Sequence, residues 1–430
     1  MCSRKYVPSN DTGLTRRNFI KTTGVVAIGT AIAGHIPTIF AQQKKPLRIG
    51  ASISLTGKYA RSGEEQHKGY MLWAKHVNEL GHSYGKADLP NSGEPGLLGR
   101  PVELIVLDDR SDPTTGVRLY NELIHSRQVD LLLGPYSSAV TNAVAPIIEN
   151  AQIPTPNPMA SSTAIWEGRN LQWQVQVQPP GSRRLPGLTQ VAMEHGDEKI
   201  AIIYEDSEFP RNAAKALRAR AKEDGLQIVL DTAYPVKITD WTPIVQQVMN
   251  SGATVLAGGG YLPDAIGITR ATRSLGYQPN ILSLLVGVAL PDYRDTLGKA
   301  ALTVTGDADW TPNVNYPGAQ KYVEAYRSEY GGVPEYHSAG GYGAAQILEE
   351  AVRRAGTVDD FEKIRDIMFE LKTTTVFNLY EVAPLDSPDS GLQLAANRVM
   401  LQVQEADGKL ENAVVYPDEA ANAQWIYPFQ

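Results

Sequence analysis

The chain has 430 residues, of which 42% are hydrophobic and 20% charged, so it can form one large or two medium-sized globular domains. Its formal net charge of −7 indicates a mildly acidic surface, which argues against nucleic acid as a partner. The single cysteine, Cys2, lies near the start of the chain, which excludes a disulfide framework and any cysteine-based metal or catalytic site in the rest of it.

The first forty residues differ from the rest and are typical of an export signal. The pair Arg16-Arg17 precedes Asn-Phe-Ile-Lys, and residues 22–40 form a charge-free stretch rich in glycine and alanine. A basic region, a modest apolar segment and a small residue predict a cleaved signal of twin-arginine type over residues 1–41, and therefore a location in the periplasm. A transmembrane anchor is the alternative, but three glycines and a proline weaken the apolar character that a membrane span needs.

From residue 47 onward, short apolar runs rich in β-branched residues alternate with stretches whose apolar spacing is close to that of a helix. Residues 47–53, 102–107 and 129–133 are strand candidates, and residues 64–80 and 113–124 are helix candidates. Strands that alternate with helices in this way predict a parallel sheet with helices on both faces.

Residues 81–99 interrupt this alternation between a predicted helix and a predicted strand. The segment is rich in glycine, proline, asparagine and serine, which favour turns and irregular backbone. A surface loop is the expected structure, and a lid over a binding site is the alternative.

The alternating pattern starts again after Pro179-Pro180-Gly181, which predicts a second doubly wound unit. The tail after residue 377 has no long helical pattern and offers two more strand candidates around the turn Asp407-Gly408. The strand candidates of this half are residues 199–204, 227–230, 253–257, 398–405 and 412–416, and its helix candidates are residues 212–224, a helix from 241, and residues 263–275.

Motifs of covalent or metal chemistry are missing from the sequence. It contains no nucleophile elbow, no metalloprotease motif, no Walker-type phosphate loop and no G-x-G-x-x-G after a strand. Seven histidines are scattered, without a pair at the helical spacing of metal ligands. We therefore predict a protein that is not an enzyme, with no catalytic residues, no metal site and no cofactor. An exported enzyme that carries a cofactor and a sensory module for a membrane receptor are the alternatives to a transport protein.

Six motifs, in order and spacing, resemble those of extracytoplasmic solute-binding proteins for branched-chain amino acids and amides. The similarity extends over residues 46–430, and it implies a type I periplasmic binding fold: α/β, with two doubly wound parallel-sheet lobes joined by three crossovers around a ligand cleft. It also implies a monomer whose partners are a small carboxylate or amide ligand and the permease subunits of an ABC transporter. The motifs are "ASISLTGKYARSG", "LIVLDDRSDP", "LLLGPYSSAVT", "IPTPNPMASS", "AGGGYLPDAIGITRATRSLGYQP" and "VVYPDEAANAQWIYP".

The resemblance also implies the lobe boundaries. Lobe 1 is expected to comprise residues 46–180 and 307–380. Lobe 2 is expected to comprise residues 181–306 and 381–430. The restart of the pattern after Pro179-Pro180-Gly181 agrees with the first of these crossings.

The motif GPYSS ends a predicted strand and opens a predicted helix, so hydroxyls and unpaired helix amides converge there at the positive end of the helix dipole. A carboxylate is the anion expected at such a site. In the family, the residues matching Ser138 and Ser161 hold the ligand carboxylate, and those matching Met159 and Ala160 contribute main-chain contacts. Tyr136, within the same motif, is counted with this set. Simple capping of its own helix is the alternative role of Ser138.

Further contacts are implied from the other sides of the cleft. Ser62 matches a position where amino acid binders often carry an aromatic residue, so its small side chain leaves room. Phe209 and Tyr261 match aromatic residues of the second lobe that cover the ligand, and core packing is their alternative role. Tyr336, or its neighbour His337, is expected to approach from the returning part of lobe 1.

One departure from the family pattern bears on the ligand. Binders of α-amino acids pair the ligand ammonium with a second-lobe carboxylate, and the matching position here is Val286. An unpaired ammonium in a closed cleft loses several kcal/mol of solvation. The sequence therefore predicts a carboxylate or amide ligand with an apolar or aromatic body and no free α-amine. A branched-chain amino acid stays the alternative, with Asp264 or Glu208 as the source of the missing charge.

Overall fold

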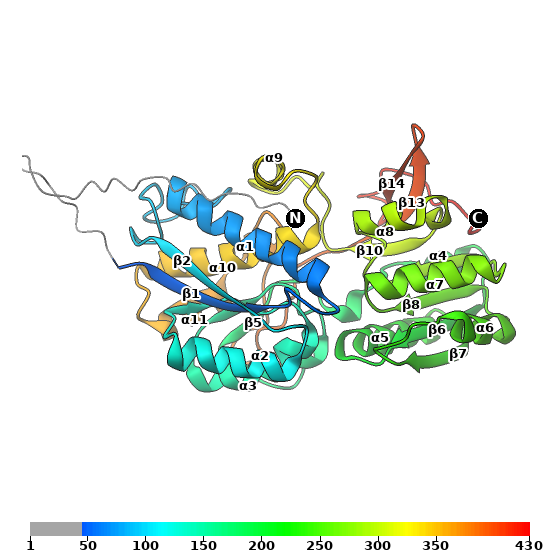
Figure 1. Cartoon of the computed structure of the whole chain (residues 1–430), viewed down its shortest axis with the longest axis horizontal. Coiled ribbons are helices and arrows are strands. Elements are labelled where there is room, and N and C mark those ends of the chain that lie inside the picture. The colour runs from blue at the N-terminus through cyan, green and yellow to red at the C-terminus, as the bar shows by residue number, and fades with distance from the viewer. Residues whose placement is uncertain (1–44) are drawn as a thin grey trace, which may run out of the picture. The chain divides into compact units, whose positions relative to one another are not determined.

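The computed structural model describes residues 45–430, so the predicted signal segment lies outside the described residues. Within that range, none of the helices combines the length and the apolar character that a membrane crossing requires. The strands form two separate groups, each covered by helices, and we call the two groups lobe 1 and lobe 2 (Figure 1).

Lobe 1 is built on five parallel strands. Three of them form a sheet in the order β2-β1-β3, and β4 pairs with β5. The amide of Gly134, just after β3, donates to the carbonyl of Pro156 in β4 (3.0 Å), so the two groups are joined edge to edge. The strands are β1 (Leu47–Ile53), β2 (Val102–Asp108), β3 (Leu131–Leu132), β4 (Thr155–Asn157) and β5 (Gln174–Gln176).

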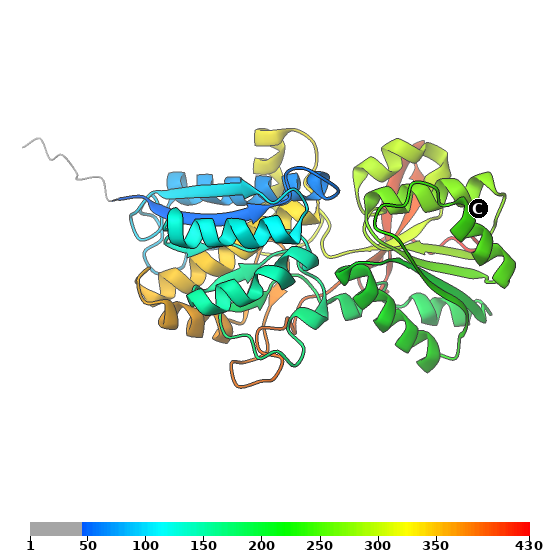
Figure 2. The same ribbon diagram turned by 60° about the horizontal axis from the view of Figure 1, so that its bottom comes forward.

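Helices cover both faces of these strands, as the sequence predicts. Helices α2 and α3 lie on one face, and α1 and α10 on the other (Figures 1 and 2). The helices of lobe 1 are α1 (Ala60–Leu80), α2 (Pro113–Asn121), α3 (Ser138–Ala151), α9 (Ala319–Tyr330), α10 (Tyr336–Ala355) and α11 (Phe361–Glu370), with a π-helical turn at Glu122–Ser126, a 3-10 turn at Thr163–Ile165 and a short pair of strands, β11 (Thr373–Thr374) and β12 (Leu379–Tyr380).

Lobe 2 contains one seven-stranded sheet in the order β14-β13-β10-β9-β8-β6-β7, in which only β13 runs antiparallel, to both of its neighbours, β10 and β14. Its strands are β6 (Lys199–Glu205), β7 (Gln227–Tyr234), β8 (Val255–Gly259), β9 (Ile281–Leu284), β10 (Thr305–Ala308), β13 (Val399–Ala406) and β14 (Lys409–Tyr416). Its helices are α4 (Leu188–Glu194), α5 (Glu208–Glu223), α6 (Thr242–Ser251), α7 (Leu262–Ser274) and α8 (Pro291–Leu297), with 3-10 turns at Gly181–Arg183 and Gly298–Ala301.

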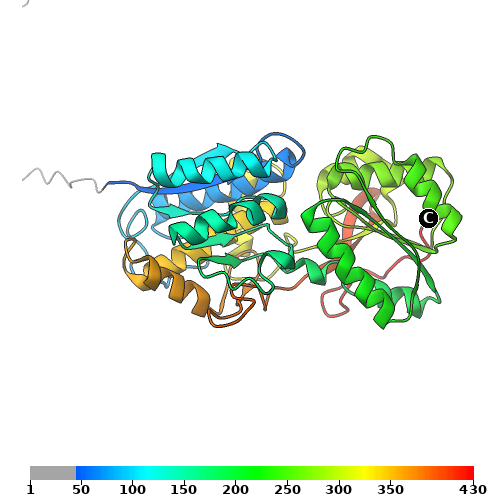
Figure 3. The same cartoon turned by 90° about the horizontal axis from the view of Figure 1, so that it is seen from below.

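Each lobe repeats one topology. Counted along the chain, the five parallel strands of either lobe lie in the order second, first, third, fourth, fifth, which is a doubly wound arrangement. The chain passes between the lobes three times, after β5, after β10 and after β12, and Figure 3 shows these connections side by side. The predicted fold class is therefore confirmed, whereas the residue boundaries proposed for the lobes stay predictions.

Residues 81–99 form a loop that packs against α10. Lys86 pairs with Glu350 at 2.5 Å, and both side chains are almost completely buried. Arg353 donates to the carbonyls of Gly81 (2.6 Å) and Asn91 (2.8 Å). Buried ionic contacts of this kind lose their partners if the loop moves, so they favour a fixed part of lobe 1 over a lid.

Candidate functional site

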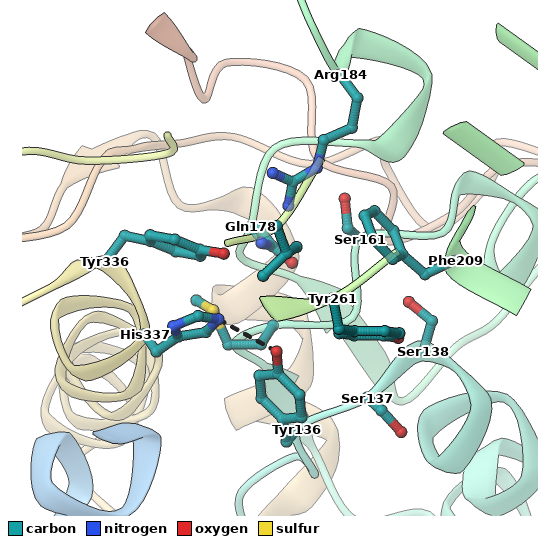
Figure 4. A pocket seen from close by; sticks show the side chains of 12 residues that line it. Tyr136, Ser137, Ser138, Ser161, Gln178, Arg184, Phe209, Tyr261, Tyr336 and His337 are labelled. Atoms are coloured by element: carbon teal, nitrogen blue, oxygen red, sulfur yellow. Dashed lines mark hydrogen bonds between the residues drawn. The ribbon is translucent and has the colours of Figure 1, made fainter. Parts of the chain in front are cut away.

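A small cavity lies between the lobes, where strands of both sheets end (Figure 4). In doubly wound sheets the carboxyl ends of the strands are the usual place for a ligand, because loops and helix N-termini converge there. The cavity is lined by Tyr136, Ser137, Ser138, Met159, Ser161, Gln178, Arg184, Phe209, Tyr261, Val286, Tyr336 and His337.

The two hydroxyls of GPYSS have different local roles. Ser137 is the N-cap of α3, and its Oγ accepts from the amide of Val140 at 3.2 Å. Ser138 is the first helical residue, and its Oγ accepts from the amide of Ser162 at 3.1 Å, which leaves its own O–H free to donate. Figure 4 shows the Ser137 hydroxyl directed away from the centre of the cavity. Capping therefore belongs to Ser137, and Ser138 is available to a ligand.

The capping role of Ser137 predicts an effect on stability. Replacing Ser137 by alanine is expected to lower the free energy of unfolding by about 1 kcal/mol, because the amide of Val140 loses its acceptor. Urea denaturation of the ligand-free protein measures this change. An unchanged midpoint would show that the cap does not stabilise α3.

The segment after β4 brings Met159 and Ser161 to the cavity. The Oγ of Ser161 donates to the carbonyl of Pro179 at 3.2 Å, so this hydroxyl must rotate to reach a ligand. Ala160 is buried outside the lining, and its carbonyl accepts from Gln176 at 2.9 Å. The ligand contact expected of Ala160 would therefore have to come from its amide.

Aromatic side chains form the apolar wall of the cavity. The rings of Phe209 and Tyr261 meet at 5.7 Å in an edge-to-face arrangement. Tyr59, on the lobe 1 side, contacts the ring of Tyr261 at 4.5 Å and that of Tyr136 at 5.9 Å. These aromatic pairs join the lobes and leave ring faces and edges for an apolar ligand body.

Tyr336 and His337 both line the cavity, so both of the candidates from the start of α10 reach it. The Tyr136 hydroxyl lies 3.2 Å from Nε2 of His337, whose Nδ1 is 3.4 Å from Glu335. Burial raises the pKa of Tyr136, and a hydrogen bond with Ser62 acts in the opposite direction. Ser62 is buried and is not part of the lining, so its predicted ligand contact stays a prediction.

Two residues that the sequence did not single out, Gln178 and Arg184, also reach the cavity. Arg184 is 2% exposed and donates to Asp307 (3.0 Å) and Asp309 (3.5 Å). Arg398 contacts the same two carboxylates, at 3.2 Å and 2.5 Å. We call these two arginines and two aspartates the hinge cluster, because they come from the three segments that connect the lobes.

Charge within the hinge cluster is balanced. Burial acts to lower the pKa of Arg184, but Asp307 and Asp309 outweigh burial and hold that pKa above its ordinary value. Burial likewise acts to raise the pKa of Asp309, and Arg184 and Arg398 hold it below its ordinary value. Arg184 and Asp309 are therefore charged at neutral pH, and Arg184 faces the cavity with two carboxylates beside it.

The carboxylates considered as partners for an ammonium are used elsewhere. Asp264 caps α7 by accepting from the amide of Tyr261 (2.7 Å) and pairs with Lys58 (3.6 Å). Glu208 accepts from the Ser162 hydroxyl at 3.0 Å. Neither of them is among the cavity-lining residues, whereas Val286 is. Within residues 45–430 no group of three or more histidine, cysteine, aspartate or glutamate side chains is placed to hold a metal ion.

Comparison with known proteins identifies the family of this chain. The family described as periplasmic binding protein matches residues 46–404. A Leu/Ile/Val-binding protein homologue from Brucella abortus is 28% identical, over 93% of this chain and 96% of its own.

Solved structures agree in fold. A solute-binding protein of an ABC transporter from Rhodopseudomonas palustris, in complex with 3,4-dihydroxybenzoic acid, has a TM-score of 0.72 at 20% identity and covers 87% of this chain and 99% of its own. A branched-chain amino acid transporter substrate-binding protein from Streptococcus pneumoniae, in complex with isoleucine, has a TM-score of 0.71 at 18% identity and covers 87% and 100%. The chain therefore belongs to the family of periplasmic binding proteins, and its fold is that of type I.

Proposed function

We propose that this protein captures a small organic acid with an aromatic or apolar body in the cavity between its lobes and delivers it to an ABC importer. The observation that carries this proposal is the composition of the cavity wall. Hydroxyls and a helix N-terminus stand on one side and aromatic rings on another, and the wall includes the apolar Val286, which matches the position of the ammonium-pairing carboxylate in binders of α-amino acids.

The start of α3 is the proposed carboxylate site. The first amides of a helix have no acceptor within the helix, and the helix dipole favours a negative group there. Each charge-assisted hydrogen bond to such a group contributes roughly 1.5–3 kcal/mol. Three or four of them, less the cost of ordering the ligand, suit the roughly −8 kcal/mol of a micromolar binder.

Closure of the lobes is the proposed mechanism of delivery. A ligand that touches Ser138 in lobe 1 and Phe209 or Tyr261 in lobe 2 binds the closed arrangement better than an open one. Only that difference in affinity can shift the population toward the closed form. The permease of the importer would then recognise the closed form. The structure resembles that form, because its two lobes are in contact around the cavity.

Isothermal titration calorimetry with benzoate and with leucine tests the ligand class. We expect benzoate to bind at least tenfold more tightly than leucine, because the leucine ammonium finds no free carboxylate in the cavity. The control is toluene, which has the ring of benzoate and lacks its carboxylate, and it is expected not to bind measurably.

A branched-chain amino acid is the second candidate, favoured by the name of the Brucella relative and by the isoleucine complex of the Streptococcus protein. Under that function the ammonium would be met by neutral acceptors such as the side-chain oxygen of Gln178. Tight binding of leucine together with no binding of benzoate would establish this second candidate and exclude the first.

A further inference from the structure

Three buried polar atoms at one end of the cavity have no hydrogen-bond partner within the described part of the chain. They are the hydroxyl of Tyr336, Oε1 of Gln178 and Nε of Arg184. All three residues line the same cavity. Buried polar groups without a partner are rare in native proteins and cost about 1–3 kcal/mol each. Three of them around one space therefore indicate a polar group of the ligand.

The three atoms lie apart from the serine end of the cavity. Figure 4 shows the Tyr336 hydroxyl and the Arg184 guanidinium directed toward Gln178, with Ser138 on the other side of the space. The ligand group that meets them is therefore a second one, distinct from the carboxylate that we assign to Ser138 and Ser161.

The hinge cluster fixes the direction of each of these groups. Nε2 of Gln178 donates to Asp309, so Oε1 is the end of the amide that accepts from the cavity. Arg184 is held by Asp307 and Asp309 and can only donate. Burial raises the pKa of Tyr336 well above its ordinary value, so its hydroxyl stays protonated and can donate and accept.

These three partners select a particular chemistry. An ammonium would approach the guanidinium of Arg184, whose charge disfavours a second cation. A carboxylate would approach Oε1 of Gln178, which offers no proton to it. A hydroxyl suits all three, because it donates to Gln178 while it accepts from Arg184 or Tyr336.

We propose that the ligand is a hydroxylated aryl acid, whose hydroxyl lies opposite its carboxylate and is bound by Tyr336, Gln178 and Arg184. This inference rests on the proposed function, because it assumes that the carboxylate occupies the serine end. The three residues then determine specificity among aryl acids, by favouring those that bring a hydrogen-bonding hydroxyl.

Calorimetry with benzoate, its meta- and para-hydroxy derivatives and the dicarboxylate terephthalate tests the inference. We expect at least one hydroxy derivative to bind about tenfold or more tightly than benzoate, and terephthalate to bind more weakly than that derivative. Equal binding of benzoate and both hydroxy derivatives would overturn the inference and leave the proposed function standing. Tightest binding of terephthalate would also overturn it. Binding of leucine and of none of the aryl acids would instead overturn the proposed function.

The variant Tyr336→Phe separates recognition of the hydroxyl from general damage to the site. Because the Tyr336 hydroxyl has no partner in the ligand-free protein, its removal is expected to leave the melting temperature equal or higher. The preference for the hydroxy derivative over benzoate is expected to fall about threefold or more. The matched control is Tyr277→Phe, which removes a hydroxyl bonded to Ala253 far from the cavity lining and is expected to keep the preference. An unchanged preference in Tyr336→Phe would overturn the role of that residue.

Discussion

Replacement of both Ser138 and Ser161 by alanine is expected to raise the Kd of an aryl carboxylate by about 100- to 10,000-fold. Each hydroxyl is proposed to donate one charge-assisted hydrogen bond to the ligand carboxylate, worth roughly 1.5–3 kcal/mol, and about 1.4 kcal/mol corresponds to a tenfold change. Calorimetry on the double variant measures the loss, and the two single variants show whether the hydroxyls contribute separately.

The folded state must be checked in the same variants, since both hydroxyls also have structural partners. Without Ser138 Oγ the amide of Ser162 loses its acceptor, and Ser161 no longer contacts Pro179 at the crossing between the lobes. Ser137→Ala is the matched control: it lowers the unfolding free energy through the cap of α3, and its effect on Kd is expected to be below tenfold. An undiminished affinity in the double variant would place the ligand carboxylate elsewhere.

The sequence predicts the elements of the sheet well where the periodic signal is long. Residues 47–53 form β1 as expected, and the hairpin turn Asp407-Gly408 has the two positive φ angles, 49° and 74°, that such a turn requires. The helix expected over residues 113–124 ends at Asn121, because the backbone changes to a π-helical turn in which the amide of Arg127 bonds to Glu122. Such a change in hydrogen bonding leaves no mark in apolar spacing.

The candidate site likewise contains residues that the sequence indicates and residues that it does not. Ser138 and Tyr261 stand in local motifs and Phe209 is indicated by the resemblance, and the structure brings all three to one cavity. Arg184 has no local signal: its carboxylate partners lie 123 and 125 residues further along the chain. An arginine is by default a surface residue, so only the folded chain shows that this one is buried among charges. The sequence feature that points to Arg184 is the adjacent pair Arg183-Arg184, which follows Pro179-Pro180-Gly181 at a predicted crossing between the lobes.

Ser62 and Ala160 illustrate the limit of a resemblance. A matching motif places a residue near the site, but the direction of its side chain or carbonyl depends on neighbours that the motif does not include. Ser62 is hydrogen-bonded with Tyr136, and the carbonyl of Ala160 is taken by Gln176, a residue of β5. Both positions stand behind the lining rather than in it.

Lys58 links the lobes beside the site, and its removal is expected to raise the Kd of the ligand by about 30- to 1,000-fold. It follows β1 in lobe 1 and pairs with Glu205 and Asp264 of lobe 2, whose side chains are 0% and 3% exposed. It also lies over the ring of Tyr261 at 5.5 Å. In Lys58→Met the closed form buries two carboxylates without their cation, at a cost of about 2–4 kcal/mol, whereas an open form exposes them to water.

Because loss of the Lys58 cation destabilises the closed form and not the open form, the variant distinguishes a contact that stabilises closure from one that stabilises the fold. Lys58→Met is expected to weaken ligand binding. In the presence of ligand, its small-angle scattering profile is expected to stay closer to that of the open form. The free energy of unfolding of the ligand-free variant is expected to change little. Adding Glu205→Gln should restore part of the affinity, because it removes one of the uncompensated charges. The matched control is Asp292→Asn, which breaks another ion pair between the lobes, to Arg61 at 2.8 Å, but at side chains 38% and 35% exposed. Solvated pairs contribute at most about 1 kcal/mol, so its effect is expected to stay below about fivefold. If both variants weakened binding equally, burial of the Lys58 contact would not be what holds the lobes together.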